Sequence, residues 1–182
     1  MKLNSHQLRA SRVGESKKIS SVIRRNPIVL VLDNILDTYN IGSFFRLADA
    51  IAAEKIYLCG SVVTPPNIKI HRASIGTWKF VPWQQANRVG ECLQKLKSTG
   101  YQIISCEQHP QSINYQQATY SFPTALVFGS ETNGVSQEAL DLSDLIVEIP
   151  LFGINKSLNV LVAASVISYN IINSLKSGKK SS

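Results

Sequence analysis

The chain has 182 residues, of which 44% are hydrophobic, and its formal net charge at pH 7 is +7. This length accommodates one domain with a sizeable core and leaves little for a second. The longest apolar-rich stretch, residues 158–172, is interrupted by two asparagines and two serines and is too short to span a bilayer, and the first residues lack the apolar core of a signal peptide. We therefore expect a cytoplasmic protein with no membrane partner.

The positive charge lies at the two ends of the chain. Residues 1–27 contain seven Lys or Arg against one Glu, the last residues add three lysines, and residues 28–175 carry a net charge of −2. Basic ends on a nearly neutral core are typical of proteins that bind a polyanion, because each cation that meets a phosphate releases a counterion. The alternative is a pair of solvated tails that aid solubility.

The basic N-terminal arm, residues 1–27, also has apolar residues at helical spacing, so we expect it to be helical and to contact nucleic acid. After the arm, strand-like runs occur at 28–33, 55–59, 101–106, 124–128 and 145–149. Helical segments follow at about 40–53, 85–98, 136–142 and 157–174. This alternation predicts an α/β fold, with a mostly parallel sheet and helices on both faces, over residues 28–174. Residues 60–83 are expected to form a long connection, and 175–182 a basic flexible tail.

Several kinds of site are excluded by the sequence. Cys59, Cys92 and Cys106 are odd in number and widely spaced, which favours neither a disulfide framework nor a cysteine metal site. The three histidines are isolated, so we expect no metal. Neither G-x-G-x-x-G nor a phosphate-binding P-loop occurs, so a nucleotide-like cofactor would have to bind in another geometry.

The first informative segment is Asn40-Ile41-Gly42-Ser43-Phe44-Phe45-Arg46, which follows the first predicted strand. A strand that enters a helix through a polar loop is where open α/β sheets place their ligand chemistry. Asn40 is expected to cap the helix, Gly42 leaves room for a close approach, and Arg46 projects from the second turn. The alternative is an ordinary capped helix with one solvated arginine.

Two later segments also follow predicted strands. The run 124–128 leads into Gly129-Ser130-Glu131-Thr132-Asn133-Gly134, a loop that exposes backbone amides, although a plain strand-to-helix turn has the same pattern. The strand at 145–149 is ended by Pro150, and Ser157 is placed to cap the final helix. That helix is apolar nearly all round, which indicates burial in the core or in a subunit interface.

Taken in order, N-x-G-x-x-x-R, F-G-S-E-x-x-G and I-P-L-x-G-x-x-x-S-L-N-V resemble the three motifs of the SpoU/TrmH family of RNA ribose 2′-O-methyltransferases, within the SPOUT superfamily. The resemblance covers residues 28 to about 172. It implies a sheet whose C-terminal segment threads through a loop to form a deep trefoil knot, and a homodimer that binds S-adenosylmethionine and acts on tRNA or rRNA.

The resemblance also assigns residues. Gly129, Ile149 and Leu158 would contact the cofactor, with Leu151 close by. Arg46 would be the catalytic arginine, and the other catalytic positions would be Asn40, Glu131, Ser157 and Asn159. Apolar residues and free amides at strand ends suit an adenine ring in a dry slot.

The implied reaction is attack of a ribose 2′-hydroxyl on the sulfonium methyl, without a metal. Lowering the pKa of a guanidinium from about 13 to near 7 would cost roughly 8 kcal/mol, so we favour a charged Arg46 that grips a phosphate over one that acts as a base. Two alternatives differ in class. One is a knotted RNA-binding or assembly factor without catalysis, and the other is a methyltransferase that acts on a nucleobase.

Overall fold

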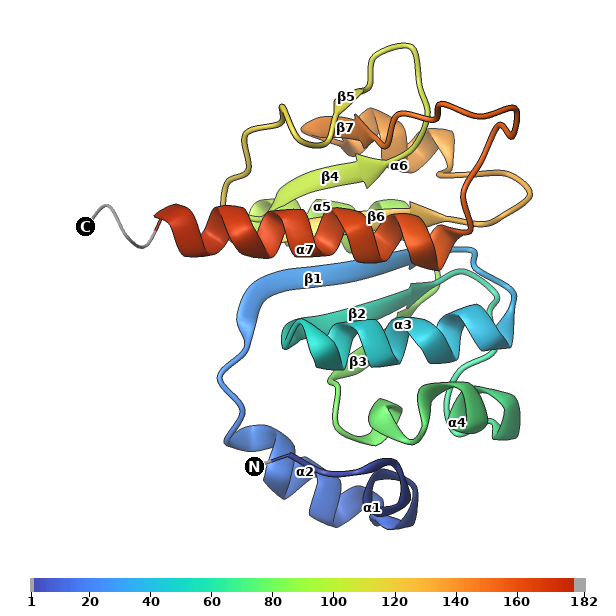
Figure 1. Ribbon diagram of the computed structural model, residues 1–182, viewed down its shortest axis with the longest axis vertical. Helices are drawn as coiled ribbons and strands as arrows, with labels where there is room; N and C mark the ends of the chain where they lie inside the picture. Colours follow the sequence, from blue (N-terminus) through green and yellow to red (C-terminus); the bar gives the residue numbers. More distant parts are fainter. Residues whose placement is uncertain (1, 179–182) are drawn as a thin grey trace.

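The computed structural model describes residues 2–178 of the chain, and Figure 1 shows its elements in order. They are α1 (Ser5–Ala10), α2 (Val13–Ser21), β1 (Asn26–Asp33), α3 (Thr38–Ala50), β2 (Ala53–Cys59), α4 (Ile68–Ser74), the short 3-10 helix η1 (Thr77–Lys79), β3 (Trp83–Ala86), α5 (Val89–Ser98), β4 (Gln102–Cys106), β5 (Ile113–Asn114), β6 (Thr124–Gly129), α6 (Gln137–Leu142), β7 (Leu145–Glu148) and α7 (Val160–Gly178).

The strands form one sheet in the order β3-β2-β1-β6-β4-β7-β5, and every pairing is parallel. Because all strands point the same way, their carboxyl ends meet at one edge of the sheet. Asp33, Glu107 and Gly129 lie at or just beyond three adjacent strand ends along that edge. This confirms the predicted parallel α/β architecture.

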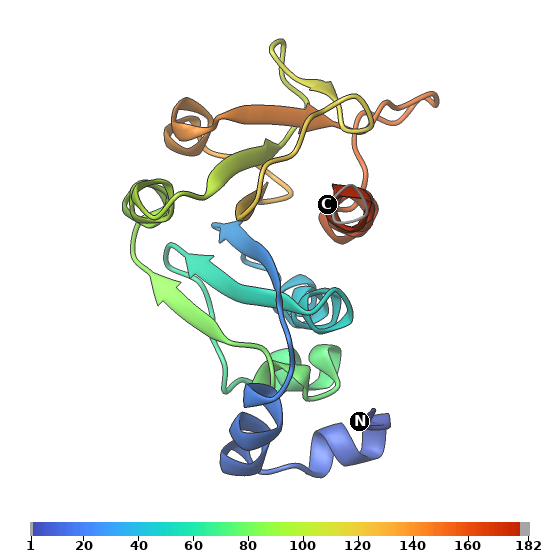
Figure 2. The same ribbon diagram turned by 90° about the vertical axis from the view of Figure 1, so that its left-hand side faces the viewer.

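Helices cover both faces of the sheet, as Figure 2 shows most clearly. Along β1, Ile28, Leu30 and Leu32 point into one hydrophobic cluster, which also includes residues of α3, α4 and α7. Val29 and Val31 alternate with them and join a second cluster with α5 and α6. The period of two along the strand therefore divides a continuous apolar run between two cores.

The structure corrects several predicted boundaries. Residues 60–83 are not only a loop, because α4 and η1 form there and the segment ends at β3, which the sequence pattern did not reveal. The next helix consequently begins at Val89 instead of residue 85. The two-residue strand β5 was also missed. At the C-terminus, α7 continues to Gly178, so the expected flexible tail does not begin at residue 175, and residues 179–182 lie outside the described residues.

Two predicted helix caps are wrong. The side chain of Asp37, not Asn40, accepts a hydrogen bond from the Tyr39 amide at the start of α3. At the start of α7, the side chain of Asn159, not Ser157, accepts hydrogen bonds from the amides of Leu161 and Val162. In both cases the capping residue lies two or three positions from the expected one, which frees Asn40 and Ser157 for other contacts.

The helix α7 has 19 residues and is longer than the stretch predicted from the sequence. Its residues 160–177 have a mean hydropathy of 1.2, so by length and composition it could cross a membrane. In the structure it packs against β6 and α3, and Ala164, Ile167 and Ile171 are buried in the core. A core helix passes the same test of length and composition.

The N-terminal arm is helical, as expected, and it is attached to the domain by specific hydrogen bonds. The Lys79 ammonium donates to the backbone carbonyls of Arg9 at 2.8 Å and Ser11 at 2.7 Å. The Arg25 guanidinium donates to the carbonyls of Ala53 at 2.9 Å and Phe80 at 2.7 Å. These contacts hold α1 and α2 beside η1, at the edge of the molecule that carries α4 (Figure 1).

All three cysteines are free thiols. The apolar runs around Cys59 and Cys106 predict two small buried side chains; Cys59 is buried, as is Cys92, whereas Cys106 is half-buried. Burial and the neighbouring Glu107 carboxylate raise the pKa of the Cys106 thiol, so it is protonated at neutral pH and is not poised as a nucleophile.

Candidate functional site

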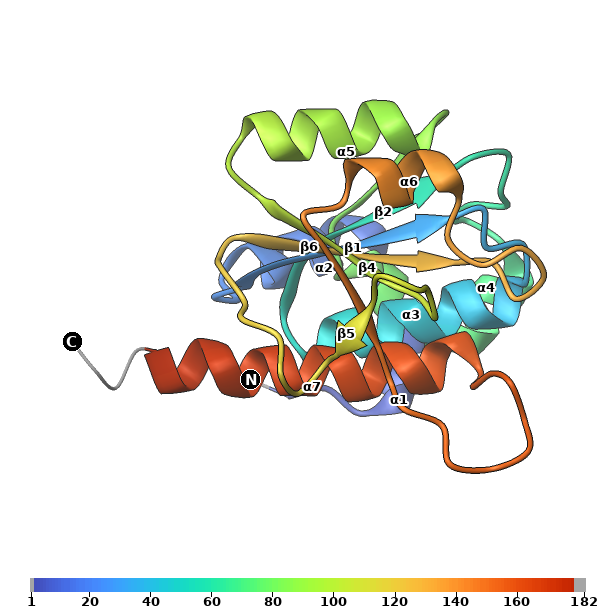
Figure 3. The same ribbon diagram turned by 90° about the horizontal axis from the view of Figure 1, so that it is seen from above.

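A cavity of about 680 Å³ lies at the carboxyl edge of the sheet. Three segments form it: the loop after β4, the loop between β6 and α6, and the long loop from β7 to α7. The last of these swings wide of the domain in Figure 3 before it returns to α7. A volume of this size is in the range of small-molecule and cofactor sites.

Seven of the nine residues singled out in the sequence line this cavity. They are Gly129, Glu131, Ile149, Leu151, Ser157, Leu158 and Asn159. Five of them come from the loop between β7 and α7, which is why the third motif is so informative. The cavity therefore brings together the second and third motif segments, which are separated along the chain by α6 and β7.

The first motif segment reaches the cavity through one contact. Asn40 does not line the cavity itself, but its side-chain amide donates a hydrogen bond to the Glu131 carboxylate. Asn40 lies in the first turn of α3, the helix that follows β1. Glu131 lies in the loop that follows β6, and β1 and β6 are parallel neighbours whose carboxyl ends lie side by side. This places the amino end of α3 at the rim of the cavity.

Arg46 lies elsewhere. Its side chain is exposed, it does not line the cavity, and it makes no hydrogen bond or ion pair with any residue in the range 2–178. Gly42, one turn earlier on α3, faces α4, where a Cβ on Gly42 would meet Ala73 at 2.5 Å. Residues four apart share a helix face, so Arg46 lies on the side of α3 that is turned toward α4.

Close packing in the loop after β6 explains why a glycine stands at position 129. A Cβ on Gly129 would lie 2.0 Å from the backbone of Gly134, so the loop folds back on itself without room for a side chain. The Gly134 amide donates to the Ser130 carbonyl, and the Asn133 amide donates to the Ser130 hydroxyl. The result is a compact turn whose backbone faces the cavity.

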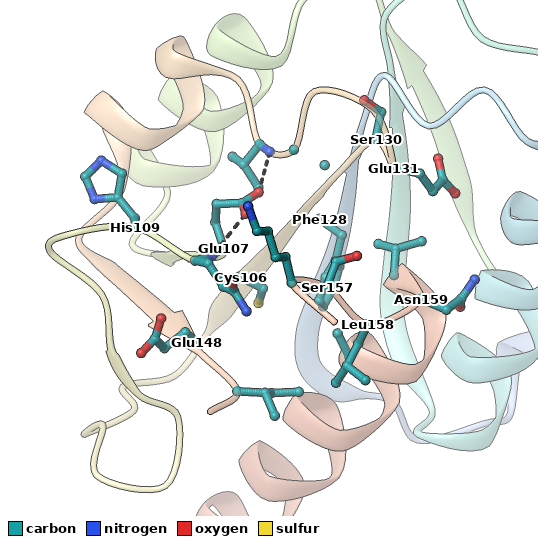
Figure 4. A pocket seen from close by; sticks show the side chains of 18 of the residues that line it. Cys106, Glu107, His109, Phe128, Ser130, Glu131, Glu148, Ser157, Leu158 and Asn159 are labelled. Atoms are coloured by element: carbon teal, nitrogen blue, oxygen red, sulfur yellow. Dashed lines mark hydrogen bonds between the residues drawn. The ribbon is translucent and has the colours of Figure 1, made fainter. Parts of the chain in front are cut away.

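The remaining lining combines apolar and charged side chains, several of which are labelled in Figure 4. Ile149, Leu151 and Leu158 supply apolar surface, while Glu107, Glu131 and Glu148 outnumber the ammonium of Lys156. Such a lining suits a ligand that has a flat apolar part and a positive charge. Within residues 2–178, no group of three or more His, Cys, Asp or Glu side chains could hold a metal ion.

Sequence reasoning missed Glu107 and Lys156. Glu107 directly follows β4, and a polar residue at the carboxyl end of a buried strand is a signal that could have identified it. Lys156 lies within the third motif segment, between residues that were singled out, and no feature of its spacing distinguishes it from a solvated lysine.

Comparison with known proteins places this geometry in context. Residues 27–169 match the family model described as the SpoU rRNA Methylase family. A tRNA (guanosine(18)-2'-O)-methyltransferase of Aquifex aeolicus is 30% identical over 156 residues, which cover 84% of this chain and 73% of the relative. The enzyme of the same name from Escherichia coli is 28% identical over 149 residues, which cover 80% of this chain and 63% of that protein.

Two solved structures have the same fold. The A. aeolicus TrmH/SpoU tRNA modifying enzyme superposes with a TM-score of 0.80 at 25% identity, covering 92% of this chain and 84% of that one. The SpoU methyltransferase AviRb from Streptomyces viridochromogenes, solved in complex with the cofactor AdoMet, gives a TM-score of 0.77 at 27% identity. That match covers 86% of this chain and 63% of AviRb.

Proposed function

This chain belongs to the SpoU rRNA methylase family, and on that premise we propose that it transfers a methyl group from S-adenosylmethionine to a ribose 2′-hydroxyl of RNA. The observation that carries the proposal is a cavity at the carboxyl edge of the sheet, which the second and third motif segments line together and which the first reaches through Asn40 and Glu131. We propose tRNA as the substrate ahead of rRNA, because the relatives from A. aeolicus and E. coli are named for tRNA.

The cavity fits S-adenosylmethionine in size and chemistry. Its volume of about 680 Å³ accommodates the cofactor, and Ile149, Leu151 and Leu158 supply apolar surface for adenine. The compact turn after Gly129 presents backbone to the same space. The excess of carboxylates in the lining complements the positive charge that the cofactor carries at sulfur.

When bound, S-adenosylmethionine supplies an electrophilic methyl group, and the residues of the chain must align a ribose hydroxyl with it. The Asn159 side-chain oxygen is occupied by the amides of Leu161 and Val162, so its amide nitrogen is the group free to donate into the site. The Ser157 hydroxyl lines the same cavity and can both donate and accept. Glu131, held by Asn40, completes this polar rim and can accept the proton that the hydroxyl loses.

We propose that Arg46 remains charged and grips a phosphate next to the target ribose. A guanidinium offers a planar set of donors that matches a phosphate in two parallel hydrogen bonds, and it carries a delocalised positive charge. The exposure of its side chain supports contact with a large ligand instead of enclosure in the chain's own cavity.

We further propose a homodimer in which Arg46 of the partner subunit serves this cavity. Val162, Val166 and Tyr169 form an apolar stripe at helical spacing on the solvent side of α7, and Tyr169 is 50% exposed. Phe152 and Ile154, in the loop from β7 to α7, are almost fully exposed. A second copy of the chain would cover these apolar side chains and bring Arg46 of the partner subunit to the cavity.

The strand order supports the proposal of a trefoil knot. The consecutive strands β4 and β5 are not neighbours, because β7 lies between them. The chain leaving β7 must therefore pass the segment 107–123 to reach α7, which packs on β6 and α3. The Asn170 side chain of α7 donates to the Tyr115 carbonyl of that segment at 3.1 Å. We propose that the chain threads through this segment.

We also propose that the protein acts in the cytoplasm, where tRNA is modified.

Calorimetric titration with S-adenosylmethionine tests the cofactor assignment and separates the enzyme from a knotted RNA-binding factor that has lost catalysis. The enzyme should bind the cofactor at one site per chain, whereas Leu158→Asp should abolish the heat of binding because it places a carboxylate against the adenine surface. A wild-type protein that is folded and shows no binding would favour the non-catalytic factor.

A further inference from the structure

Two carboxylates accept hydrogen bonds from the loop that follows β6, one beside each of the two strands that neighbour β6. β6 lies between β1 and β4 in the sheet. Asp33, at the end of β1, accepts a hydrogen bond from the Ser136 amide at 2.8 Å, and Glu107, just after β4, accepts one from the Val135 amide at 2.8 Å. Two consecutive amides are thus held from both sides.

The two carboxylates have different surroundings. Asp33 is buried, and its second oxygen accepts a hydrogen bond from the Asn34 side chain at 2.9 Å. Glu107 is half-buried and lines the cavity, where Figure 4 shows its carboxylate between the strands and the loop. Its backbone amide also donates to the Val147 carbonyl of β7 at 3.0 Å. Glu107 therefore joins the loop after β6 to strand β7 and also lines the cavity, which Asp33 does not.

Apart from these two contacts, the hydrogen bonds of the loop are internal, between Ser130 and residues 133–134, or reach α3 through Asn40. Glu131, Thr132 and Asn133 at its tip are exposed, and the Val135 side chain is only 5% exposed. The Glu107 oxygen also fills the space beside Gly134, where a Cβ would lie 2.4 Å from it. Removing the carboxylate would leave the Val135 amide without its acceptor and open the space that keeps the turn compact.

We propose that Glu107 is a positioning residue of the cofactor cavity: its carboxylate fixes residues 129–135 in the conformation that accepts the methyl donor. The proposal rests on the function proposed above for this site. Glu107 acts through the loop, so its loss should weaken cofactor binding and leave the rate of the bound complex nearly unchanged. The effect comes from the hydrogen-bond acceptor more than from the charge.

Three variants separate these contributions. Glu107→Ala removes the acceptor and the charge, Glu107→Gln keeps an acceptor without the charge, and Glu148→Ala removes an equal charge from the same cavity. Within residues 2–178, the Glu148 side chain holds no backbone amide of the loop, which makes Glu148→Ala the matched control. Cofactor affinity is measured by calorimetry, and amide hydrogen exchange at Val135 is measured on the protein without cofactor.

Glu107→Ala should raise the dissociation constant of S-adenosylmethionine about tenfold or more, and should speed exchange of the Val135 amide by about as much. The Ser136 amide, held by Asp33, should stay protected. Glu107→Gln should lie within about threefold of wild type in both measurements, and Glu107→Ala should raise KM for the cofactor while kcat at saturating substrates changes less than about twofold.

Unchanged Val135 exchange in Glu107→Ala would overturn the proposal, as would a loss of affinity in Glu148→Ala equal to that in Glu107→Ala. If Glu107→Ala fails to fold, the comparison of Glu107→Gln with Glu148→Ala decides, because the proposal predicts that the glutamine variant retains exchange protection at Val135. Failure of the wild-type protein to bind S-adenosylmethionine would instead contradict the proposed function, so the two failures are distinguishable.

Discussion

The side chain of Asn40 donates a hydrogen bond to the carboxylate of Glu131, and this contact joins two segments that are 91 residues apart. Asn40 belongs to the first turn of α3, and Glu131 to the loop after β6. The contact assigns the amino end of α3 to the rim of the cavity. Arg46, farther along the same helix, lies outside the cavity of its own chain.

The first prediction concerns the guanidinium of Arg46. Arg46→Ala should lower kcat/KM for RNA methylation by about a hundredfold or more, and Arg46→Lys should remain well below wild type because an ammonium lacks the planar fork. The side chain is exposed and unpaired within residues 2–178, so stability and the affinity for S-adenosylmethionine should not change. Near-normal turnover of Arg46→Lys would contradict the assigned role.

The second prediction tests whether Arg46 acts across the dimer. Arg46→Ala and Asn159→Ala each inactivate one component of the site, and the two proteins can be unfolded together and refolded as mixed dimers. If Arg46 serves the partner's cavity, each mixed dimer has one intact site, and an equimolar mixture should recover about a quarter of wild-type activity. If Arg46 serves its own cavity, no site in the mixture is intact and activity should stay at background.

The third prediction concerns the basic arm. Arg9, Arg12 and Lys18 are exposed, and replacing all three with Gln should weaken RNA binding and reduce the slope of log K against log salt by about 2 to 3. This triple variant is preferable to deletion of residues 1–25, because Arg25 satisfies the carbonyls of Ala53 and Phe80.

Lys95→Gln is a control with one charge removed, since it takes an exposed cation from α5, which covers the face of the sheet away from α3 and α4. Cofactor affinity should be unaffected in both proteins. An unchanged salt slope in the triple variant would show that the arm does not contact RNA.

The fourth prediction concerns pH. The Trp78 indole N–H donates to Nδ1 of His71 at 3.1 Å, and burial lowers the pKa of His71, helped by the charges of Lys79 and Arg9. The unfolded chain therefore takes up the His71 proton first, near the ordinary pKa of about 6.5. This contribution to stability should be complete above about pH 7 and decline as the pH falls from about 6.5 toward the lower pKa of the folded state.

Urea midpoints at pH 7.5 and 5.5 measure this effect. Wild type should lose more stability over the interval than His71→Gln, in which the amide oxygen can still accept from Trp78 but cannot titrate there. Equal losses in the two proteins would show that His71 does not contribute to the pH dependence.

Strongly periodic elements could be predicted from the sequence, and weak or nonlocal ones could not. The first predicted strand, 28–33, is apolar at every position from 28 to 32 because both faces of β1 are covered, and this pattern identified it. By contrast, β5 has two residues and β3 includes two glutamines, so neither carries an apolar signal. β5 is a strand because it pairs with β7, which is distant in the sequence. β3 is a strand because it pairs with β2, from which the long segment between them separates it.

The candidate site shows the same limit. The motif segments identified residues that line the cavity, because each segment follows a strand and all parallel strands end at one edge. The sequence placed Asn40 and Ser157 as helix caps, but Asp37 and Asn159 hold those positions. The capping residue is the one whose backbone angles are those of the position just before the helix. Several nearby Asp, Asn or Ser residues have side chains that could fill this role, and their type alone does not show which one does. Arg46 lies away from the cavity of its own chain because of the direction in which α3 runs. The local sequence pattern does not predict that direction.

Locating the transferred methyl group tests most directly whether this chain methylates the 2′-hydroxyl of a ribose. The purified protein is incubated with tRNA and S-adenosylmethionine carrying a labelled methyl, and the RNA is digested to nucleosides for mass analysis. Methyl transfer to ribose predicts label on the ribose of one 2′-O-methylated nucleoside, about a hundredfold less label with Arg46→Ala, and none with Leu158→Asp. Label on a nucleobase, or no label from a protein that binds both RNA and cofactor, would contradict it.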